Sequence, residues 1–299
     1  MEWKASDGPV KITSWRELHA LDGYIPQISK DEVGLGAICG KYGIKDQGKE
    51  RCAIKECRTP HFAGALVILT GGGVTNIGHR CGRKYFPDQW AAMEGEFGAV
   101  AKKDREAVKL ANAKEQAHGV LERLAELDAS LQKHHAFQQA FEKHVPSSIV
   151  DEVYRRAQKN AEAIMVAVRL TGNELEIARA TNDPSAKTGL TEKVVGQLRG
   201  LAIFRTGNDP WRLAEYTVRP SCQKLLTYGG GNSVVMNRLV AAVSRAHSVV
   251  DQIVSSLSQS EQFFTEENLA NLLKLPNARN VRFRAIGISQ SGELWVSRG

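Results

Sequence analysis

Two short apolar runs separated by three glycines predict a β-hairpin in the N-terminal third of the chain. Residues 63–70 (AGALVILT) are rich in strand-forming side chains, and residues 74–77 (VTNI) form a second run. The three glycines between them, 71–73, can adopt the positive φ angles of a tight turn without steric cost. The next segment, GHRCG at 78–82, predicts a turn that leads into a short helix.

A long helix is predicted from Pro87 to His144, because proline is tolerated at the first helical position and Pro146 ends the pattern. From Leu110 onward, seam residues recur in alternating steps of three and four, which predicts a coiled coil. This seam comprises Leu110, Ala113, Ala117, Val120, Leu124, Leu127, Leu131, His134, Gln138, Phe141 and Val145. The two polar residues of the seam, His134 and Gln138, either fix the register of the coiled coil or lie where the partner helix is hydrated or absent. We favour the second interpretation.

A second helix is predicted from Ser148, which would form a capping box with Asp151, to about Thr181. The two helices would make a long antiparallel αα-hairpin. At about 1.5 Å per residue the first helix would be roughly 85 Å long, much longer than the second. The N-terminal module, the C-terminal domain or a second chain must therefore cover the rest of its apolar stripe, and we expect a homo-oligomer.

The C-terminal part of the chain is predicted to be a separate α+β domain after a linker at 182–185 (NDPS). It contains an apolar helix at 234–257, a helix from Thr265 to Leu275, and strands at 281–288 and 293–296. The expected fold class is α+β and mainly α. The expected domains are a zinc module at 1–86, a helical hairpin at 87–182 and the α+β domain at 183–299.

Composition places the chain among ordinary globular proteins. It has 299 residues, of which 42% are hydrophobic and 24% charged. No run of 18 apolar residues indicates a transmembrane helix, and the first residues lack the apolar core of a secretory signal. We therefore expect a cytoplasmic protein without a membrane partner.

Cysteine spacing predicts a zinc site. Four of the five cysteines fall between positions 39 and 81, and in a cytosolic chain such clustering favours metal over disulfides. Cys52-x4-Cys57 would supply one half of a tetrahedral site, and Cys81, after the hairpin, the other half. The candidates for the fourth ligand are His61, His79 and Cys39. No carboxylate in the pattern suggests a general base, so we expect a structural Zn²⁺ and no catalytic residues.

The order of ligand turn, β-hairpin and ligand at a helix start resembles treble-clef zinc fingers over residues 52–86. It departs from that family in the four-residue spacing of the first pair and in the His-x-Cys or lone Cys of the second half. The family is functionally diverse, so the resemblance implies zinc and little about role. The C-x4-C-R-x-P-H motif followed by TNIGHRCGRKYF also resembles uncharacterised phage or prophage proteins.

Positive charge is concentrated at the two ends of the chain. The net charge is +7, and residues 1–86 carry 13 Lys and Arg against 9 Asp and Glu. Candidate phosphate-binding residues beside the cysteines and on the last predicted strand pair are Arg58, Arg80, Arg83, Lys84, Arg282 and Arg284. Strand alternation places the last two opposite Phe283, which we assign to the core together with Phe86. A solvated basic face is the alternative reading of these charges.

No nucleotide-binding loop, nucleophile elbow or zinc-protease motif is present, and Cys222 has no identified base. The first hypothesis is therefore a non-enzymatic, oligomeric zinc-finger and coiled-coil protein that binds nucleic acid. The second is a phage-type protein–protein adaptor or inhibitor that acts on a host or defence complex through its coiled coil. The third is an unrecognised enzyme within residues 187–299.

Overall fold

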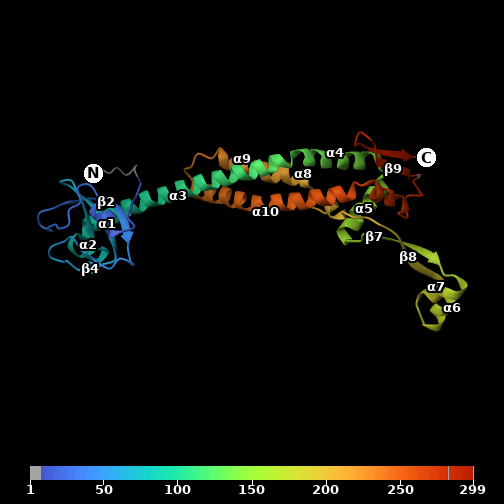
Figure 1. Cartoon of the computed structure of the whole chain (residues 1–299), viewed down its shortest axis with the longest axis horizontal. Coiled ribbons are helices and arrows are strands. Elements are labelled where there is room, and N and C mark those ends of the chain that lie inside the picture. Colours follow the sequence, from blue (N-terminus) through green and yellow to red (C-terminus); the bar gives the residue numbers. More distant parts are fainter. Residues whose placement is uncertain (1–7, 282, 299) are drawn as a thin grey trace. The chain divides into compact units, whose positions relative to one another are not determined.

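The structure, a computed structural model, describes residues 8–281 and 283–298 (Figure 1). The chain divides into two compact units, Met1–Ala111 and Asn112–Gly299. Helix α3 (Pro87–Glu126) includes the point of division. None of the described helices has the length and apolar character that a membrane span requires.

The first unit is built on a four-stranded sheet with the order β1-β2-β5-β6. Strand β1 is parallel to β2, whereas β5 is antiparallel to both β2 and β6. The predicted hairpin of β5 and β6 is confirmed, and Gly72 and Gly73 in its turn have φ angles of 92° and 86°. The bounds of the strands are β1 (Val10–Lys11), β2 (Leu35–Gly43), β5 (Ala63–Leu69) and β6 (Val74–Ile77).

Two short helices and a two-stranded ladder accompany the sheet in this unit. Helix α1 (Trp15–His19) begins at a Ser14 cap, and β3 (Glu50–Arg51) pairs with β4 (Pro60–His61). The predicted short helix after the hairpin is α2 (His79–Tyr85). The core beneath it contains Phe86, as predicted, and the fully buried Trp90 of α3.

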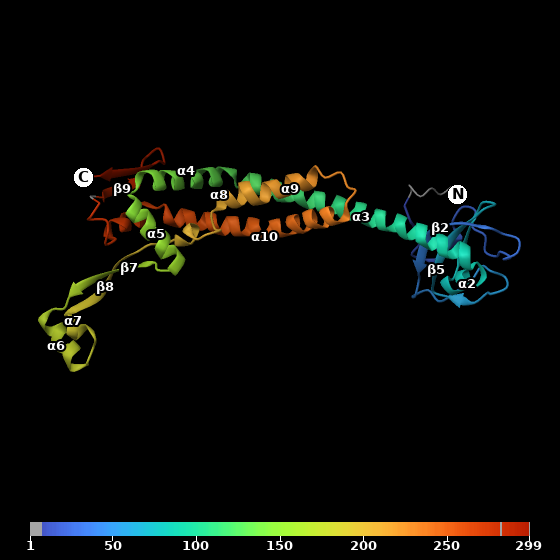
Figure 2. The same ribbon diagram turned by 180° about the vertical axis from the view of Figure 1, so that it is seen from behind.

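The second unit contains a bundle of three helical segments, which Figures 1 and 2 show side by side. The residues of α3 from 112 onward and α4 (Asp128–His144) form the first segment, which breaks only at Leu127. Helix α10 (Ser233–Phe263) runs in the same direction, because Arg123 contacts Asp251 at 3.0 Å while His134 contacts Ser260 at 2.8 Å. The predicted helices at 87–144 and 234–257 are thus confirmed, apart from that break.

The third segment runs antiparallel to the other two. It consists of α8 (Pro210–Leu213), a π-helical turn (Ala214–Val218) and α9 (Arg219–Leu226). Arg219 forms an ion pair with Asp128, and Trp211, earlier in the segment, stacks on His135 with 4.5 Å between ring centroids.

The seam of the first helix is covered within the chain. Leu124, Leu131 and Phe141 are fully buried, and His134 is only 2% exposed. The expectation of a wet or absent partner at His134 is therefore wrong, since Ser260 of α10 hydrogen-bonds to its ring. Because α10 and the α8–α9 segment supply the cover, the seam no longer argues for a second chain.

The predicted second helix is wrong beyond Lys159. Helix α5 (Ser147–Lys159) ends at Asn160, whose φ of 54° is left-handed, and the alternating sequence AIMVAVR then forms β7 (Ala163–Arg169). Its β-branched side chains suit a strand better than a helix. The predicted capping box is also wrong, because Pro146 occupies the cap position and no side chain caps the helix.

Strand β7 pairs antiparallel with β8 (Leu190–Gln197), and α6 (Gly172–Ala180) and α7 (Ser185–Thr188) connect them. The sequence read as a linker, 182–185, thus lies within this connection. A capping box does occur here, formed by Thr171 and Glu174 at the start of α6.

The end of the chain folds against α4, α5 and the end of α10 around an aromatic core that includes Phe141, Phe204 and Phe263. The remaining elements are a 3₁₀ helix (Leu201–Phe204), α11 (Glu266–Ala270), a second 3₁₀ helix (Asn271–Lys274), β9 (Phe283–Ile288) and β10 (Leu294–Arg298). These confirm the predicted terminal helix and strand pair. Phe283 is buried, as predicted.

Candidate metal centre

Three cysteine thiols meet in the first unit. The Sγ atoms of Cys52, Cys57 and Cys81 all lie within 4.8 Å of one another, and those of Cys57 and Cys81 are 3.0 Å apart. A tetrahedral zinc ion with Zn–S bonds of about 2.3 Å separates its sulfurs by roughly 3.8 Å. The three thiols are therefore close enough to bind one metal ion.

A tight turn brings the first two cysteines together. The backbone N–H groups of Cys57 and Arg58 both donate to the carbonyl of Ile54, at 3.0 and 2.9 Å. Arg58 has a φ of 44°, a left-handed conformation that is uncommon for a residue with a side chain. The N–H of Cys52 donates to Thr59 at 3.1 Å and closes the turn. Cys81 arrives from the first turn of α2, after the β5–β6 hairpin.

The surroundings of the thiols favour their deprotonated form only in part. Burial raises the pKa of Cys52 and Cys81, although backbone N–H groups of Gly78 and Ile54 donate to the Cys52 sulfur and oppose this shift. Burial also acts to raise the pKa of Cys57, but hydrogen bonds from Thr59 and the neighbouring thiols outweigh it and lower that pKa. A bound cation is needed to stabilise three thiolates together.

Two of the fourth-ligand candidates, Cys39 and His79, face groups outside the cluster of thiols. Cys39 lies in β2 within a separate core cluster, and its Sγ is 3.6 Å from the carbonyl oxygen of Leu66. Burial raises the pKa of its thiol to about 11. His79 directs Nδ1 toward Glu94, with 3.5 Å between Nδ1 and Oε1, but this buried nitrogen makes no hydrogen bond among the described residues. Neither residue belongs to the group of three thiols.

The third candidate, His61, also lies outside that group but has a free ring nitrogen. Its Nδ1 is 3.3 Å from the hydroxyl of Tyr42, whereas its Nε2 is buried and has no hydrogen-bond partner among the described residues. Neither Tyr42 nor Thr59 was identified from the sequence. Thr59 could have been, because it follows Cys57 by two residues, but Tyr42 carries no spacing signal.

Exposed basic side chains occupy both segments that carry the thiols. Arg58 follows Cys57, Arg80 precedes Cys81, and no ion pair within the described ranges involves either guanidinium. Arg83 forms a 3.0 Å ion pair with Glu94. Lys84 lies over the Tyr85 ring, 5.0 Å from its centroid. Arg284 is exposed on β9 in the second unit, and Arg282 lies outside the described residues.

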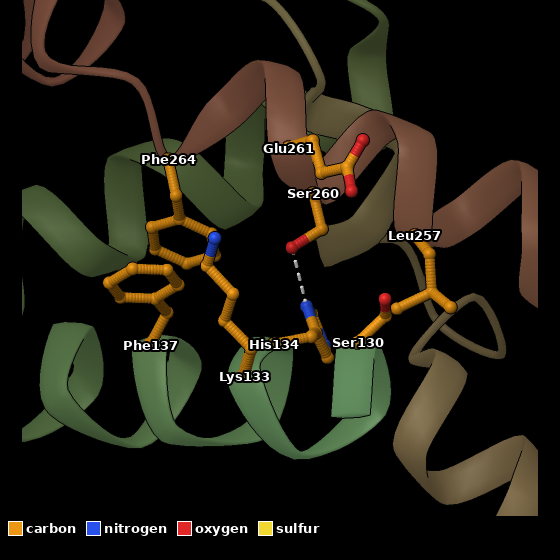
Figure 3. A pocket seen from close by; sticks show the side chains of 8 residues that line it. All are labelled: Ser130, Lys133, His134, Phe137, Leu257, Ser260, Glu261 and Phe264. Carbon is orange, nitrogen blue, oxygen red and sulfur yellow. Dashed lines mark hydrogen bonds between the residues drawn. The ribbon is translucent and has the colours of Figure 1, made fainter. Parts of the chain in front are cut away.

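A second group of polar side chains lies in the bundle of the other unit. Figure 3 shows the His134 ring pointing from α4 toward Ser260 of α10, beside a cavity of about 100 Å³. The Oδ1 atom of Asp209 is 3.9 Å from His134 Nε2, beyond hydrogen-bonding distance. Ser260 is only 4% exposed, and Nε2 of His134 has no hydrogen-bond partner among the described residues. We therefore interpret this group as a packing contact.

No protein-family model, curated protein or solved structure matches the chain. The treble-clef and phage resemblances therefore depend on the quoted motifs alone. The cluster of three thiols and the basic side chains beside it are the features among the described residues that point to a function.

Proposed function

We propose that Cys52, Cys57 and Cys81 bind Zn²⁺ and that the metal has a structural role. The 54–57 turn and the β5–β6 hairpin separate these residues in sequence, so one metal ion ties together the end of β3, that turn and α2. Soft thiolates favour zinc over magnesium or calcium. The group of ligand atoms contains no carboxylate to act as a general base, which favours a structural over a hydrolytic centre.

We further propose that the metal module binds nucleic acid through its exposed cations. The observation that carries this proposal is that Lys55, Arg58 and Arg80 are all exposed on the segments that hold the metal. A small module fixed by a metal presents such side chains to phosphates at a low entropic cost. Glu56 is the only acidic residue in the 52–58 turn, so the turn carries net positive charge.

Metal analysis tests the first half of the proposal. The full chain purified without added metal should contain about one zinc per molecule, and Cys81→Ser should lose it. Cys222→Ala and Cys39→Ala are matched controls, because both thiols are buried away from the cluster, and both variants should retain zinc. Zinc loss in a control variant, or a zinc-free wild type that also fails to take up added zinc, would contradict the proposal.

Fluorescence anisotropy at two salt concentrations tests the second half. The zinc-loaded chain should bind short DNA or RNA in a salt-dependent manner. Arg58→Glu combined with Arg80→Glu should weaken binding and remove roughly one unit of salt slope for each lost phosphate contact. The control is Lys102→Glu with Lys103→Glu, an equal charge change at exposed positions of α3. Equal losses in the two variants, or no binding at low salt, would reject this function.

A further inference from the structure

The imidazole of His61 is oriented as in a histidine that binds metal. Its Nδ1 lies 3.3 Å from the hydroxyl of Tyr42, a residue of β2 that is only 4% exposed. In protein metal sites the ring nitrogen that does not bind the metal is commonly fixed by such a hydrogen bond. Because Tyr42 fixes the ring through Nδ1, the other nitrogen, Nε2, remains available.

The β3–β4 ladder places His61 on the same face as Cys52. His61 pairs with Glu50, and the N–H of Cys52 bonds to Thr59, so Cys52 lies opposite Thr59 one step further along. Side chains two residues apart on a strand share a face, and so do those directly opposite one another. Glu50, Cys52, Thr59 and His61 therefore all project from one face of the ladder.

Gly78 provides a second link between the imidazole and the thiols. Its N–H donates to the sulfur of Cys52, and a Cβ atom built on it would lie 2.9 Å from Cδ2 of His61. The His61 ring thus packs directly on a residue that contacts a candidate ligand. Glycine at this position lets the ring come closer than any other residue would.

The Nε2 atom of His61 is an unsatisfied polar group. It is buried and has no hydrogen-bond partner among the described residues. Leaving a buried polar atom unpartnered costs about 1–3 kcal/mol. A metal ion bound at the neighbouring thiols would provide the missing partner.

We propose that Nε2 of His61 is the fourth ligand of the metal held by Cys52, Cys57 and Cys81. This inference rests on the proposed metal centre and makes it a Cys₃His site. Nε2 is not among the atoms that lie within 4.8 Å of one another, so the ring moves toward the sulfurs when the metal binds. Of the competing candidates, the Cys39 thiol lies 3.6 Å from the carbonyl oxygen of Leu66. His79 faces the carboxylate of Glu94 at 3.5 Å, although its Nδ1 is also buried without a hydrogen bond among the described residues.

Cobalt substitution of the full chain distinguishes the ligand sets, because Co²⁺ reports both thiolate binding and tetrahedral geometry in its absorption spectrum. The wild type and the matched control His79→Phe should show sulfur-to-cobalt charge-transfer bands and intense tetrahedral ligand-field bands. His61→Phe should keep the charge-transfer bands, lose ligand-field intensity, and bind Zn²⁺ about tenfold more weakly or worse in a competition titration.

A rescue experiment guards against simple misfolding. Imidazole added to Co²⁺-loaded His61→Gly should restore the wild-type ligand-field spectrum, and imidazole should leave the His79→Gly spectrum unchanged. A His61→Phe spectrum and zinc affinity equal to those of the wild type would overturn the assignment of His61 while leaving the thiolate centre intact. The absence of charge-transfer bands in the wild type would instead overturn the metal centre itself.

Discussion

Nδ1 of His134, on α4, lies 2.8 Å from Oγ of Ser260, on α10, and both side chains are almost fully buried. This hydrogen bond lies within the apolar seam of the long helix, at the position where the heptad pattern has a histidine. We predict that Ser260→Ala destabilises the second unit by about 1–3 kcal/mol, because it leaves the ring nitrogen buried without its partner. Denaturant unfolding measures this change. Ser248→Ala, at an exposed position of the same helix, is the control and should have a much smaller effect.

Stability should also depend on pH through His134. Burial lowers the pKa of its imidazole, an effect that Asp209 opposes and His135 reinforces. The unfolded chain then binds a proton more readily than the folded chain, so stability is fully present above pH 6.5, the ordinary pKa, and decreases as the pH falls below it. Unfolding experiments at pH 7.5 and 5.5 should show a smaller loss for His134→Gln than for the wild type. Equal losses would assign the pH dependence to other groups, such as His61 and His79.

The junction of α2 and α3 should be intolerant of a methyl group. A Cβ atom on Gly82 would lie 2.2 Å from the ring of Trp90, which is fully buried, so Gly82→Ala should cost about 1–3 kcal/mol and weaken zinc binding. Gly95→Ala in α3 is the matched control. That position is exposed and no atom lies within 4 Å of the added Cβ, so the change should stabilise the helix by about 0.5–1 kcal/mol. Thermal unfolding with zinc measurement checks both, and a neutral Gly82→Ala would contradict the packing.

The sequence predicted those elements that form through contacts between residues close to one another in the chain. The β5–β6 hairpin followed from its glycine turn, and the long helix from its heptads and its flanking prolines. The sequence did not predict which segment packs on that helix, because α10, which covers His134, lies more than a hundred residues further along the chain. In the candidate metal centre, cysteine spacing identified the three thiols that the fold brings together. The contact of Tyr42 with His61 could not be predicted, since it joins β2 and β4, two strands of different sheets.

A contact between two different elements also explains why the helix predicted beyond Lys159 does not form. Arg156 is 9% exposed at its side chain, bonds to Glu152 at 2.7 Å, and donates to the carbonyl of Ala163 at 2.7 Å. Its guanidinium thereby ties the last turn of α5 to the first residue of β7, after Asn160 has reversed the chain. This contact stabilises a helix-to-strand change that periodicity alone does not reveal.

Removing that guanidinium should be far more costly than removing its neighbour. Arg156→Ala removes the ion pair with the partly buried Glu152 and the hydrogen bonds to the carbonyls of Ala161 and Ala163, while Arg155 stays on Glu152, so we expect a loss of about 1–3 kcal/mol. Arg155 bonds to the same carboxylate at 2.6 Å, but its side chain is 53% exposed. Arg155→Ala should therefore cost less than about 1 kcal/mol. Denaturant unfolding of both variants gives the comparison, and similar losses would show that Arg156 does not hold α5 to β7.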